Sequence, residues 1–526
     1  MNPMSVAQQL LYAMQLLVQP GSLALLALAT AVGVLAGALP GVSTTMAVAL
    51  LAPMTYTMDP LLGILVLCAI QVASTYGGSI SATLLNVPGT PASAATGLEG
   101  YPLTRSGEGG SALGFNALQS FLGTLIGTAL LLVATPFLAR AALRFGPWEY
   151  FWLSIFGVVI CAYLARTSRL KGLVAGGVGF LLSFVGLDPM WAHPRFTLGN
   201  VYLMDGIPLI PAMVGLYGMA EVLDQIGRPG RDPAALERGV RIPWKEVVAN
   251  LALSVRVSVI GFLIGVLPGL GANIASWVGY DHAMRTSRKP DRFGKGSYEG
   301  LAGSEAANNA CVPGAYVPLL TLAIPGDNVT AIVLAALQIH GVRVGPTFLV
   351  ENAHWLYAIA GSMVLAACMF LAVGVLVARP FVAALRAPRP AVMGVVAVLC
   401  VVGSYAVNSR HFDVVVMLAF GLVGLAMRRL GYPVAPMILA MVLGREMIDT
   451  NFRRALLAGK YSFAPFVTRP ISLALVAMLL ALLAHDGWKA YRAWRGRIGS
   501  AVAAAGTVPA PAAQPSGVAA DRGKGG

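Results

Sequence analysis

Long apolar stretches that are nearly free of charged residues dominate this sequence. Four of them cover residues 21–39, 111–139, 350–377 and 471–484. A helix needs about 20 mostly apolar residues to cross the hydrocarbon core of a bilayer. Only 11% of the chain is charged, whereas an average soluble domain carries about 25%. No alternating apolar pattern of the membrane-barrel type is present. We therefore predict an all-α polytopic membrane protein with about 12 transmembrane or part-spanning helices.

The rest of the composition argues against several other classes of protein. The formal net charge is +14, but no aromatic-basic module or zinc-ligand spacing supports nucleic-acid binding. Lys and Arg residues instead gather in predicted cytoplasmic loops. The five cysteines are scattered, so their spacing predicts neither a metal site nor a disulfide framework. No ATP-binding loop or hydrolase motif is found, and we predict a non-enzyme without a cofactor.

Two halves of the chain repeat one pattern. "GVLAGALPGVSTTMAVAL" begins at Gly33 and "GFLIGVLPGLGANIASWV" begins at Gly261. Further along, "LLNVPGTPASAA" corresponds to "LAIPGDNVTAIV". Proline removes a backbone donor and glycine permits an unusual φ, so each Pro-Gly pair should end a helix. The predicted helix breaks are Pro40, Gly41, Pro88, Gly89, Pro268, Gly269, Pro325 and Gly326.

The loops of the two halves differ in charge. "RTSRKPDRFGK" in the second half is strongly basic, whereas the corresponding "TYTMDP" in the first half has no basic residue. Cytoplasmic loops collect Lys and Arg, so the halves should face opposite ways as inverted repeats. We predict a first transmembrane half at 1–227 and a charged cytoplasmic connector at 228–246. A second half follows at 247–486, and a basic, then disordered, cytoplasmic tail at 487–526.

Polar residues gather around the predicted breaks, where secondary transporters bind their cargo. The stretch "GSEAANNACVPG" (303–314) holds one carboxylate, two adjacent amides and a Pro-Gly pair that predicts a turn. Helix N-termini suit a substrate carboxylate, while amide and hydroxyl oxygens suit Na⁺. The predicted substrate- or ion-binding residues are Ser79, Ser81, Asn86, Gly89, Thr90, Asn273, Glu305, Asn308, Asn309, Asp327 and Asn328.

Each of these residues also has a structural interpretation. Any single Ser or Thr can simply bond to its own helix. Asp327 directly follows a Pro-Gly pair, where a helix N-cap belongs. Glu305 fits a ligand, a proton carrier or a helix-stabilising group. The pair Asn308 and Asn309 is costly in an apolar bundle unless partners satisfy it. We expect Glu305 and this pair to face an internal cavity, opposite Asn86 of the other half.

At these residues the chain resembles the large permease subunit of the tripartite tricarboxylate transporters. The resemblance covers nearly all of the chain before the tail. Small departures are Cys311-Val312-Pro313 and Ser404, where smaller residues are expected. The stretches that carry it are "GALPGVSTTMAVALLAPMTY", "YGGSISATLLNVPGTPASAATGLEGYP", "GVLPGLGANIASWVGYD", "FGKGSYEGLAGSEAANNACVPGAYVPLLTLAIPGDN" and "HGVRVGP".

The resemblance implies a subunit of the bacterial inner membrane that works with a small membrane subunit and a separate extracytoplasmic solute-binding protein. It implies import of citrate or another small carboxylate by alternating access, driven by a Na⁺ or H⁺ gradient. Membrane lipid is the remaining expected partner, and nucleic acid is not one. Three other functions stay open: an anion channel, an intramembrane enzyme, and a signalling or scaffold subunit that binds solute without flux.

Overall fold

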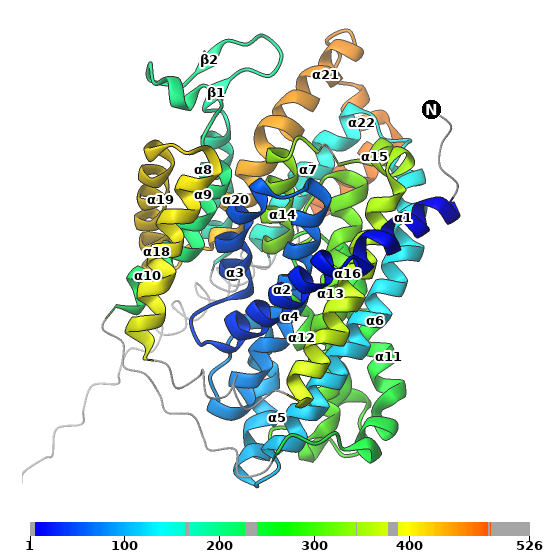
Figure 1. The fold of residues 1–526 in the computed structure, drawn as a ribbon. Helices are drawn as coiled ribbons and strands as arrows, with labels where there is room; N and C mark the ends of the chain where they lie inside the picture. The colour runs from blue at the N-terminus through cyan, green and yellow to red at the C-terminus, as the bar shows by residue number, and fades with distance from the viewer. Residues whose placement is uncertain are drawn as a thin grey trace, which may run out of the picture. The chain divides into compact units, whose positions relative to one another are not determined.

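The computed structural model describes residues 6–163, 168–226, 239–342, 344–376, 388–481 and 484, and these residues are almost entirely helical (Figure 1). The elements of the first half are α1 (Val6–Val18), α2 (Pro20–Ala38), α3 (Thr44–Leu51), η1 (Ala52–Thr57), α4 (Pro60–Leu85), η2 (Pro91–Ser93), α5 (Ala94–Arg105), α6 (Gly109–Ala142), α7 (Pro147–Tyr163), α8 (Arg169–Ser183), β1 (Gly186–Leu187), β2 (Pro194–Arg195), η3 (Val201–Leu203), α9 (Leu209–Met213), η4 (Val214–Met219) and α10 (Ala220–Gln225).

The second half follows a similar order. Its elements are α11 (Trp244–Val266), α12 (Gly271–Thr286), η5 (Pro290–Arg292), α13 (Tyr298–Leu322), α14 (Asn328–Ile339), α15 (Pro346–Glu351), α16 (Ala353–Leu376), α18 (Arg389–Asn408), α19 (His411–Arg429), α20 (Val434–Leu443), η6 (Gly444–Asp449), α21 (Thr450–Ala458) and α22 (Pro465–Thr468). The strands β1 and β2 form one antiparallel pair in which Gly186 faces Arg195. Each half contains a π-helical turn in its later part, η4 in the first half and η6 in the second.

Seven of the described helices are long and apolar enough to cross a membrane: α2, α4, α6, α11, α16, α18 and α19. Three shorter apolar helices, Pro147–Tyr163, Asn328–Ile339 and Pro470–Ala481, accompany them. The predicted stretches 21–39, 111–139 and 350–377 correspond to α2, α6 and α16. The prediction of an all-α polytopic membrane protein is confirmed.

All four Pro-Gly pairs of the repeat lie between helices. Pro40-Gly41 separates α2 from α3, and Pro88-Gly89 separates α4 from η2 and α5. In the second half, Pro268-Gly269 separates α11 from α12, and Pro325-Gly326 separates α13 from α14. The two halves therefore share a broken-helix pattern, because proline cannot donate the backbone hydrogen bond that would continue each helix.

The repeat extends to helix packing. In the first half α2 packs on α4, and in the second α11 packs on α13. A Cβ at Gly37 would lie 2.1 Å from the Ser74 carbonyl oxygen, and one at Gly265 would lie 2.2 Å from the Cys311 carbonyl oxygen. Only glycine allows such close approach of two membrane helices. The same backbone contact is thus built twice.

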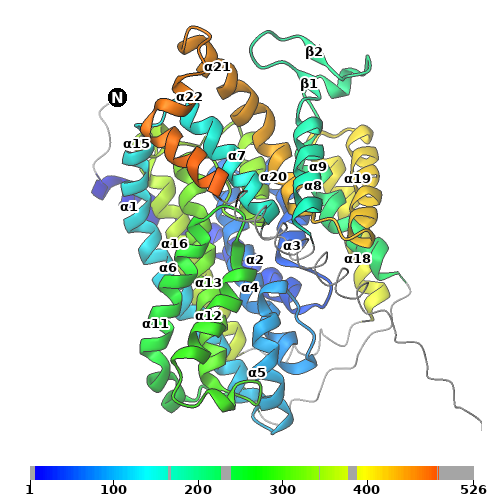
Figure 2. The same cartoon turned by 180° about the vertical axis from the view of Figure 1, so that it is seen from behind.

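The two halves are inverted with respect to each other. Thr104 of α5 donates a hydrogen bond to the carbonyl of Thr83, near the end of α4 (2.8 Å). Glu99 of α5 accepts hydrogen bonds from backbone N–H groups at 294–297, just before α13 begins. The end of α4 and the start of α13 therefore lie together, so these corresponding helices run in opposite directions (Figures 1 and 2).

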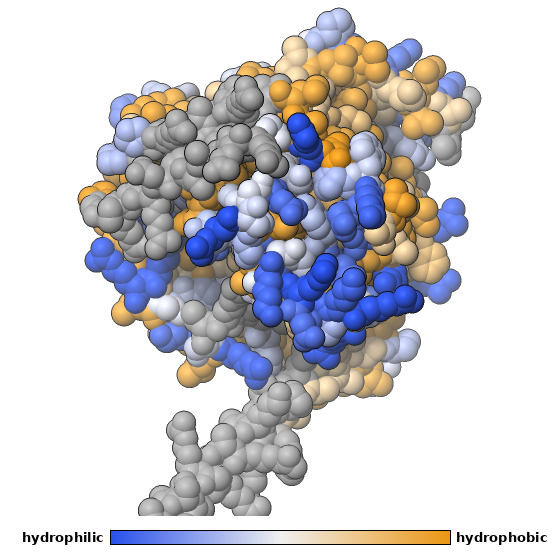
Figure 3. All heavy atoms as spheres, turned by 90° about the horizontal axis from the view of Figure 1, so that it is seen from below, coloured by the Kyte–Doolittle hydropathy of each residue, from blue (hydrophilic) through white to orange (hydrophobic). Residues whose placement is uncertain are grey.

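One end of the bundle carries many exposed charged side chains. Figure 3, a view from below, shows hydrophilic side chains gathered on the face that carries α5. This is the end that the basic loop after α12 predicts to be cytoplasmic, and the orientation stays a prediction. The exposed basic residues of this end are Arg105, Arg241, Lys245, Arg285, Arg288, Lys289, Arg292 and Lys295.

One local prediction is wrong: Pro313-Gly314 does not form a turn. Helix α13 continues through Pro313 and Pro318 to Leu322. Neighbouring helices can support a proline inside a membrane helix, and here α6 and α11 pack along α13. Gly314 helps, because it brings α13 against the Phe262 carbonyl oxygen, 2.4 Å from where a Cβ would lie.

The bundle extends to Phe466, and the chain from Val467 onward forms a separate unit. Its described part consists mainly of the helix Pro470–Ala481. The predicted tail at 487–526 and most of the predicted connector at 228–246 lie outside the described residues. The division into halves, connector and tail stays a prediction.

Replacing Gly37 with alanine is expected to destabilise the bundle, because the new methyl group would overlap the Ser74 carbonyl oxygen. Overpacking of this kind costs about 1–3 kcal/mol. Gly21→Ala is the matched control on the same helix, since nothing lies within 4 Å of its added Cβ. Thermal unfolding of the purified proteins in detergent measures the difference. Equal midpoints for the two variants would contradict the close approach of α2 and α4.

Candidate functional site

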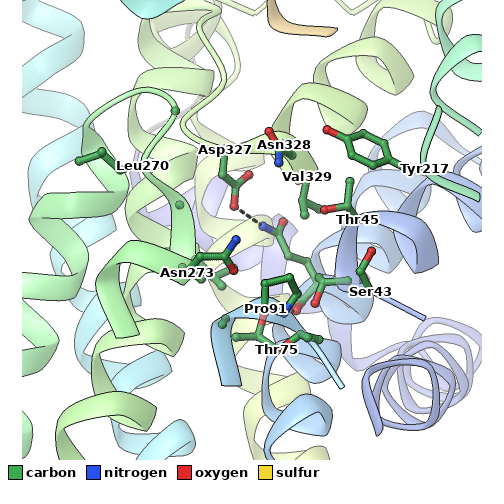
Figure 4. Close-up of a pocket in the computed structure, with 18 of the residues that line it drawn as sticks. Ser43, Thr45, Thr75, Pro91, Tyr217, Leu270, Asn273, Asp327, Asn328 and Val329 are labelled. Atoms are coloured by element: carbon green, nitrogen blue, oxygen red, sulfur yellow. Dashed lines mark hydrogen bonds between the residues drawn. The ribbon is translucent and has the colours of Figure 1, made fainter. Parts of the chain in front are cut away.

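A cavity of about 400 Å³ lies where the broken helices of the two halves meet (Figure 4). This volume is within the range of small-molecule sites in proteins. Ser43, Thr44 and Thr45 line it from the start of α3, and Thr90, Pro91 and Ala92 line it from the start of η2. The second half contributes Leu270, Gly271, Ala272 and Asn273 from the start of α12, and Asp327, Asn328 and Val329 from the start of α14.

Four helical segments therefore begin at this one cavity. The first N–H groups of a helix have no partner within it, and they carry partial positive charge. Ser43 caps α3 by accepting a hydrogen bond from the Met46 N–H (3.2 Å), whereas Leu270 gives α12 no side-chain cap. Two of these starts come from each half, so the inverted repeat brings four helix starts together. Side chains cap α3 and α14, the latter with the Asp327 carboxylate, whereas the uncapped start of α12 favours an anion.

Two hydroxyl groups in the cavity wall have no hydrogen-bond partner among the described residues. They belong to Thr90, which is 2% exposed, and to Tyr217, which is 9% exposed. Tyr217 reaches the cavity from the π-helical turn η4 (Figure 4). A buried hydroxyl without a partner costs about 1–3 kcal/mol. Both groups are thus available to donate to a bound ligand.

Arg428 is the only basic residue among those that line the cavity. It lies near the end of α19 and forms an ion pair with Glu221 of α10. Gln225 donates a second hydrogen bond to Glu221 (2.8 Å), and Arg428 also contacts the Tyr217 carbonyl oxygen (3.4 Å). The guanidinium offers five donors, so it can bind a carboxylate at this wall.

Gln71 of α4 connects the two halves at the floor of the cavity. Its amide nitrogen donates to Asp327 (3.2 Å), and its oxygen accepts from the Tyr316 hydroxyl (2.8 Å). Asp327 is the N-cap of α14 and accepts from the Thr330 N–H (2.7 Å), which is the structural interpretation offered above. These bonds hold the Asp327 carboxylate in place beside the helix starts. Without Asp327, the only anion at those starts would be a ligand.

A second polar cluster surrounds Glu305, deeper in the bundle. Its carboxylate accepts hydrogen bonds from the hydroxyl of Thr96 and from the hydroxyl of Ser120 (2.8 Å). The Asn309 amide donates to the Glu305 carbonyl (3.2 Å) and to the Asn308 side chain (2.6 Å). All five residues are fully buried.

The predicted binding residues thus fall into three groups. The cavity is lined by Thr90, Asn273, Asp327 and Asn328. The Glu305 cluster includes Asn308 and Asn309, with Ser79 beside it. The third group lies outside both the cavity and the Glu305 cluster and consists of Ser81, Asn86 and Gly89.

The last three residues shape the backbone locally. The Ser81 hydroxyl donates to the Gly78 carbonyl of its own helix (3.3 Å). Asn86 is exposed and ends α4 in the left-handed conformation (φ 51°). A Cβ at Gly89 would lie 2.0 Å from the carbonyl oxygen of Gly37. The structure does not bring Asn86 to the Glu305 cluster as expected, because α13 is unbroken there and directs Glu305 toward α5 and α6.

Sequence reasoning missed Gln71, Tyr217 and Arg428 as cavity residues. Gln71 is a lone amide inside the apolar run "LGILVLCAIQVAS", and a buried amide in such a run requires partners. That signal was available for Gln71. Tyr217 lies between the second and third Pro-Gly breaks and Arg428 lies after the fourth, both far from any break, so only folding brings them to the site.

The arrangement suits binding and movement of a solute. Among the described residues, no group of three or more His, Cys, Asp or Glu side chains is placed to hold a metal ion. The cavity instead offers N–H groups, hydroxyls, amides and one guanidinium, together with the carboxylates of Glu221 and Asp327, which are bonded to Arg428 and Gln71. The donor groups can bind a negatively charged solute by hydrogen bonding.

Comparisons with known proteins agree with this description. The family model described as "Tripartite tricarboxylate transporter TctA family" matches residues 23–439. An uncharacterized 52.8 kDa protein in the TAR-I ttuC' 3' region of Agrobacterium vitis is 35% identical over 460 residues, which is 85% of this chain and 90% of that protein. An uncharacterized protein in the TAR-II ttuC' 3' region of the same organism is 33% identical over 228 residues, 42% of this chain and 94% of that protein. No solved structure matches.

Proposed function

This chain belongs to the tripartite tricarboxylate transporter TctA family, and we propose that it is the large membrane subunit of a secondary transporter that imports citrate or another small carboxylate. The observation that carries the proposal is the cavity where four helical segments begin, two from each inverted half, beside Arg428. A carboxylate is the solute whose charge and oxygen atoms match these donors.

In the proposed complex, cargo binding begins outside the membrane. A separate solute-binding protein delivers the carboxylate to the extracytoplasmic side, and a small membrane subunit accompanies this chain in the bacterial inner membrane. No nucleotide-binding loop is present in the sequence, so an ion gradient supplies the energy. The coupling ion is Na⁺ or H⁺.

Inverted halves provide a physical basis for alternating access. One half moves against the other around the cavity, and the cavity opens first outward and then inward. Gln71 and Asp327 join the halves at this point, since one lies in α4 and the other at the start of α14. Cargo drives this change only by binding one state more tightly than the other.

The test is uptake of labelled mono-, di- and tricarboxylates into cells that express this chain with its small subunit and binding protein. Na⁺ and H⁺ gradients are imposed separately. The proposal expects one class of acid to accumulate against its gradient, and the accumulated label to remain chemically unchanged. Accumulation should disappear when ionophores dissipate the gradient. It should also disappear when the binding protein is omitted.

Other outcomes would contradict the proposal in distinct ways. Flux that only equalises the concentrations would indicate a channel. Binding without flux would indicate a solute-binding signalling or scaffold subunit. A chemically altered product would indicate an enzyme.

A further inference from the structure

Glu305 is an unusual carboxylate because it is fully buried without an opposite charge. It is 0% exposed and lies in α13, and none of the ion pairs among the described residues includes it. Its hydrogen-bonding neighbours are all neutral side chains: the hydroxyls of Thr96 and Ser120, with Ser79 and Asn308 also beside it. An ionised carboxylate with no cation beside it is costly in the interior, and protonation removes that cost.

Glu99 in the neighbouring helix α5 provides the contrast. It is equally buried, but it accepts hydrogen bonds from the backbone N–H groups of Gly294 (2.6 Å), Gly296 (2.9 Å) and Ser297 (2.7 Å) and from the Tyr280 hydroxyl (2.6 Å). Three of these donors are backbone N–H groups of the loop before α13, so Glu99 anchors that loop. The neighbours of Glu305 are instead side chains of the membrane helices.

The elements packed on α13 bring no cation to Glu305. From α4 the titratable neighbour is Tyr76, which is neutral at physiological pH. From α5 and α12 the buried titratable groups are Glu99 and Tyr280, which bond to each other near the start of α13. Arg256 of α11 is exposed, and α6 presents uncharged polar residues along this contact.

The packing around Glu305 favours a proton over a metal cation. A Cβ at Gly123 would lie 2.3 Å from the Ala306 carbonyl oxygen, and one at Gly127 would lie 2.7 Å from the Ala310 carbonyl oxygen. Helices α6 and α13 are therefore in backbone contact at the level of Glu305 and one turn beyond it. A bound cation needs a shell of several oxygen ligands, whereas a proton needs no added volume.

Along α13, Glu305 lies between the cavity and the predicted cytoplasmic end of the bundle. Val312 of α13 lines the cavity, and Asn308 and Glu305 follow one and two turns toward the cytoplasmic end of the same helix face. Seven residues of helix span about 10 Å. On the facing helix, Thr75 lines the cavity and Ser79 lies one turn deeper, beside Glu305.

We propose that Glu305 is the proton-binding site that couples this transporter to a proton gradient. Its carboxylate takes one proton from water while the cavity is open to the outside. The O–H bond breaks, and the proton passes to water, when the bundle opens to the cytoplasm. The inference rests on the proposed carrier function and adds the identity of the coupling ion and the residue that binds it.

The test uses proteoliposomes that contain this chain and its small subunit, with the binding protein supplied outside. In wild type, a pH difference of one unit, acid outside, should support up to about tenfold accumulation of the carboxylate per coupled proton. Glu305→Gln keeps the shape and neutral state of the protonated acid. It should abolish accumulation driven by the pH difference, while exchange of labelled for unlabelled carboxylate across the membrane persists.

Two further variants keep the result interpretable. Glu108→Gln makes the same chemical change at an exposed acid of the cytoplasmic end and should behave like wild type. Glu305→Asp keeps a titratable group and should recover part of the pH-driven accumulation, which a purely structural role would not predict. Accumulation by Glu305→Gln at the wild-type level, or wild-type accumulation that responds only to Na⁺, would overturn the inference. If the wild-type protein shows no exchange of labelled for unlabelled carboxylate, the proposed carrier function is overturned as well.

Discussion

Arg428→Gln is expected to reduce carboxylate uptake by about 30-fold or more, mainly through a higher KM. Among the described residues that line the cavity, Arg428 is the only basic one, and its partner Glu221 is an acid. The Arg428 and Glu221 side chains are 30% and 15% exposed, so breaking this partly buried pair should cost about 2 kcal/mol, the low end of the range for buried charge pairs. Here the loss has two parts, because the ligand loses a charged donor and Glu221 is left to repel the incoming anion. Initial uptake rates over a range of carboxylate concentrations measure the effect.

Two further substitutions separate these parts. Arg429→Gln removes the neighbouring positive charge on α19, which is exposed and does not line the cavity, and uptake should be unchanged. Glu221→Gln frees the Arg428 guanidinium while removing the repelling charge, so KM should fall or stay equal. An Arg428→Gln protein that transports like wild type at equal membrane levels would place the cargo away from this wall.

Asp327→Ala and Asp327→Thr are expected to differ sharply. Asp327 caps α14 and accepts bonds from the Thr330 N–H and from Gln71. Alanine removes the cap, at about 0.5–2 kcal/mol, and leaves the Gln71 amide unsatisfied, at about 1–3 kcal/mol. The membrane level and the thermal stability of this variant should both fall.

Threonine should restore much of that stability, because Thr90 occupies the corresponding position of the first half. Both positions follow a Pro-Gly pair by one residue, and in both the residue three positions later bonds back to the N–H of the cap. Thr is itself a good N-cap residue. Asp327→Thr also removes a negative charge from the cavity, so carboxylate uptake should persist. Thermal unfolding and uptake are measured on both variants, and equal loss in both would show that the carboxylate itself is required.

The sequence carried much of the information about the fold. Charge-poor stretches identified α2, α6 and α16, and the paired Pro-Gly breaks identified the four places where helices begin at the cavity. These features are local, because hydrophobic length and proline geometry act within a single segment. Pro313 shows the limit of such reasoning. The same residue type leaves α13 unbroken, since α6 and α11 support the helix where an isolated segment would bend.

For the candidate site, too, the sequence and the tertiary structure account for different residues. The sequence by itself determined that polar residues at Thr90, Asn273 and Asp327 would stand at broken helix starts. Only the tertiary structure decided that Arg428 and Tyr217 join them, and that Glu305 lies in a separate buried cluster. The physical reason is that a helix break depends on neighbouring residues in the chain. Which side chains share a cavity depends instead on how two inverted halves, hundreds of residues apart, pack against each other.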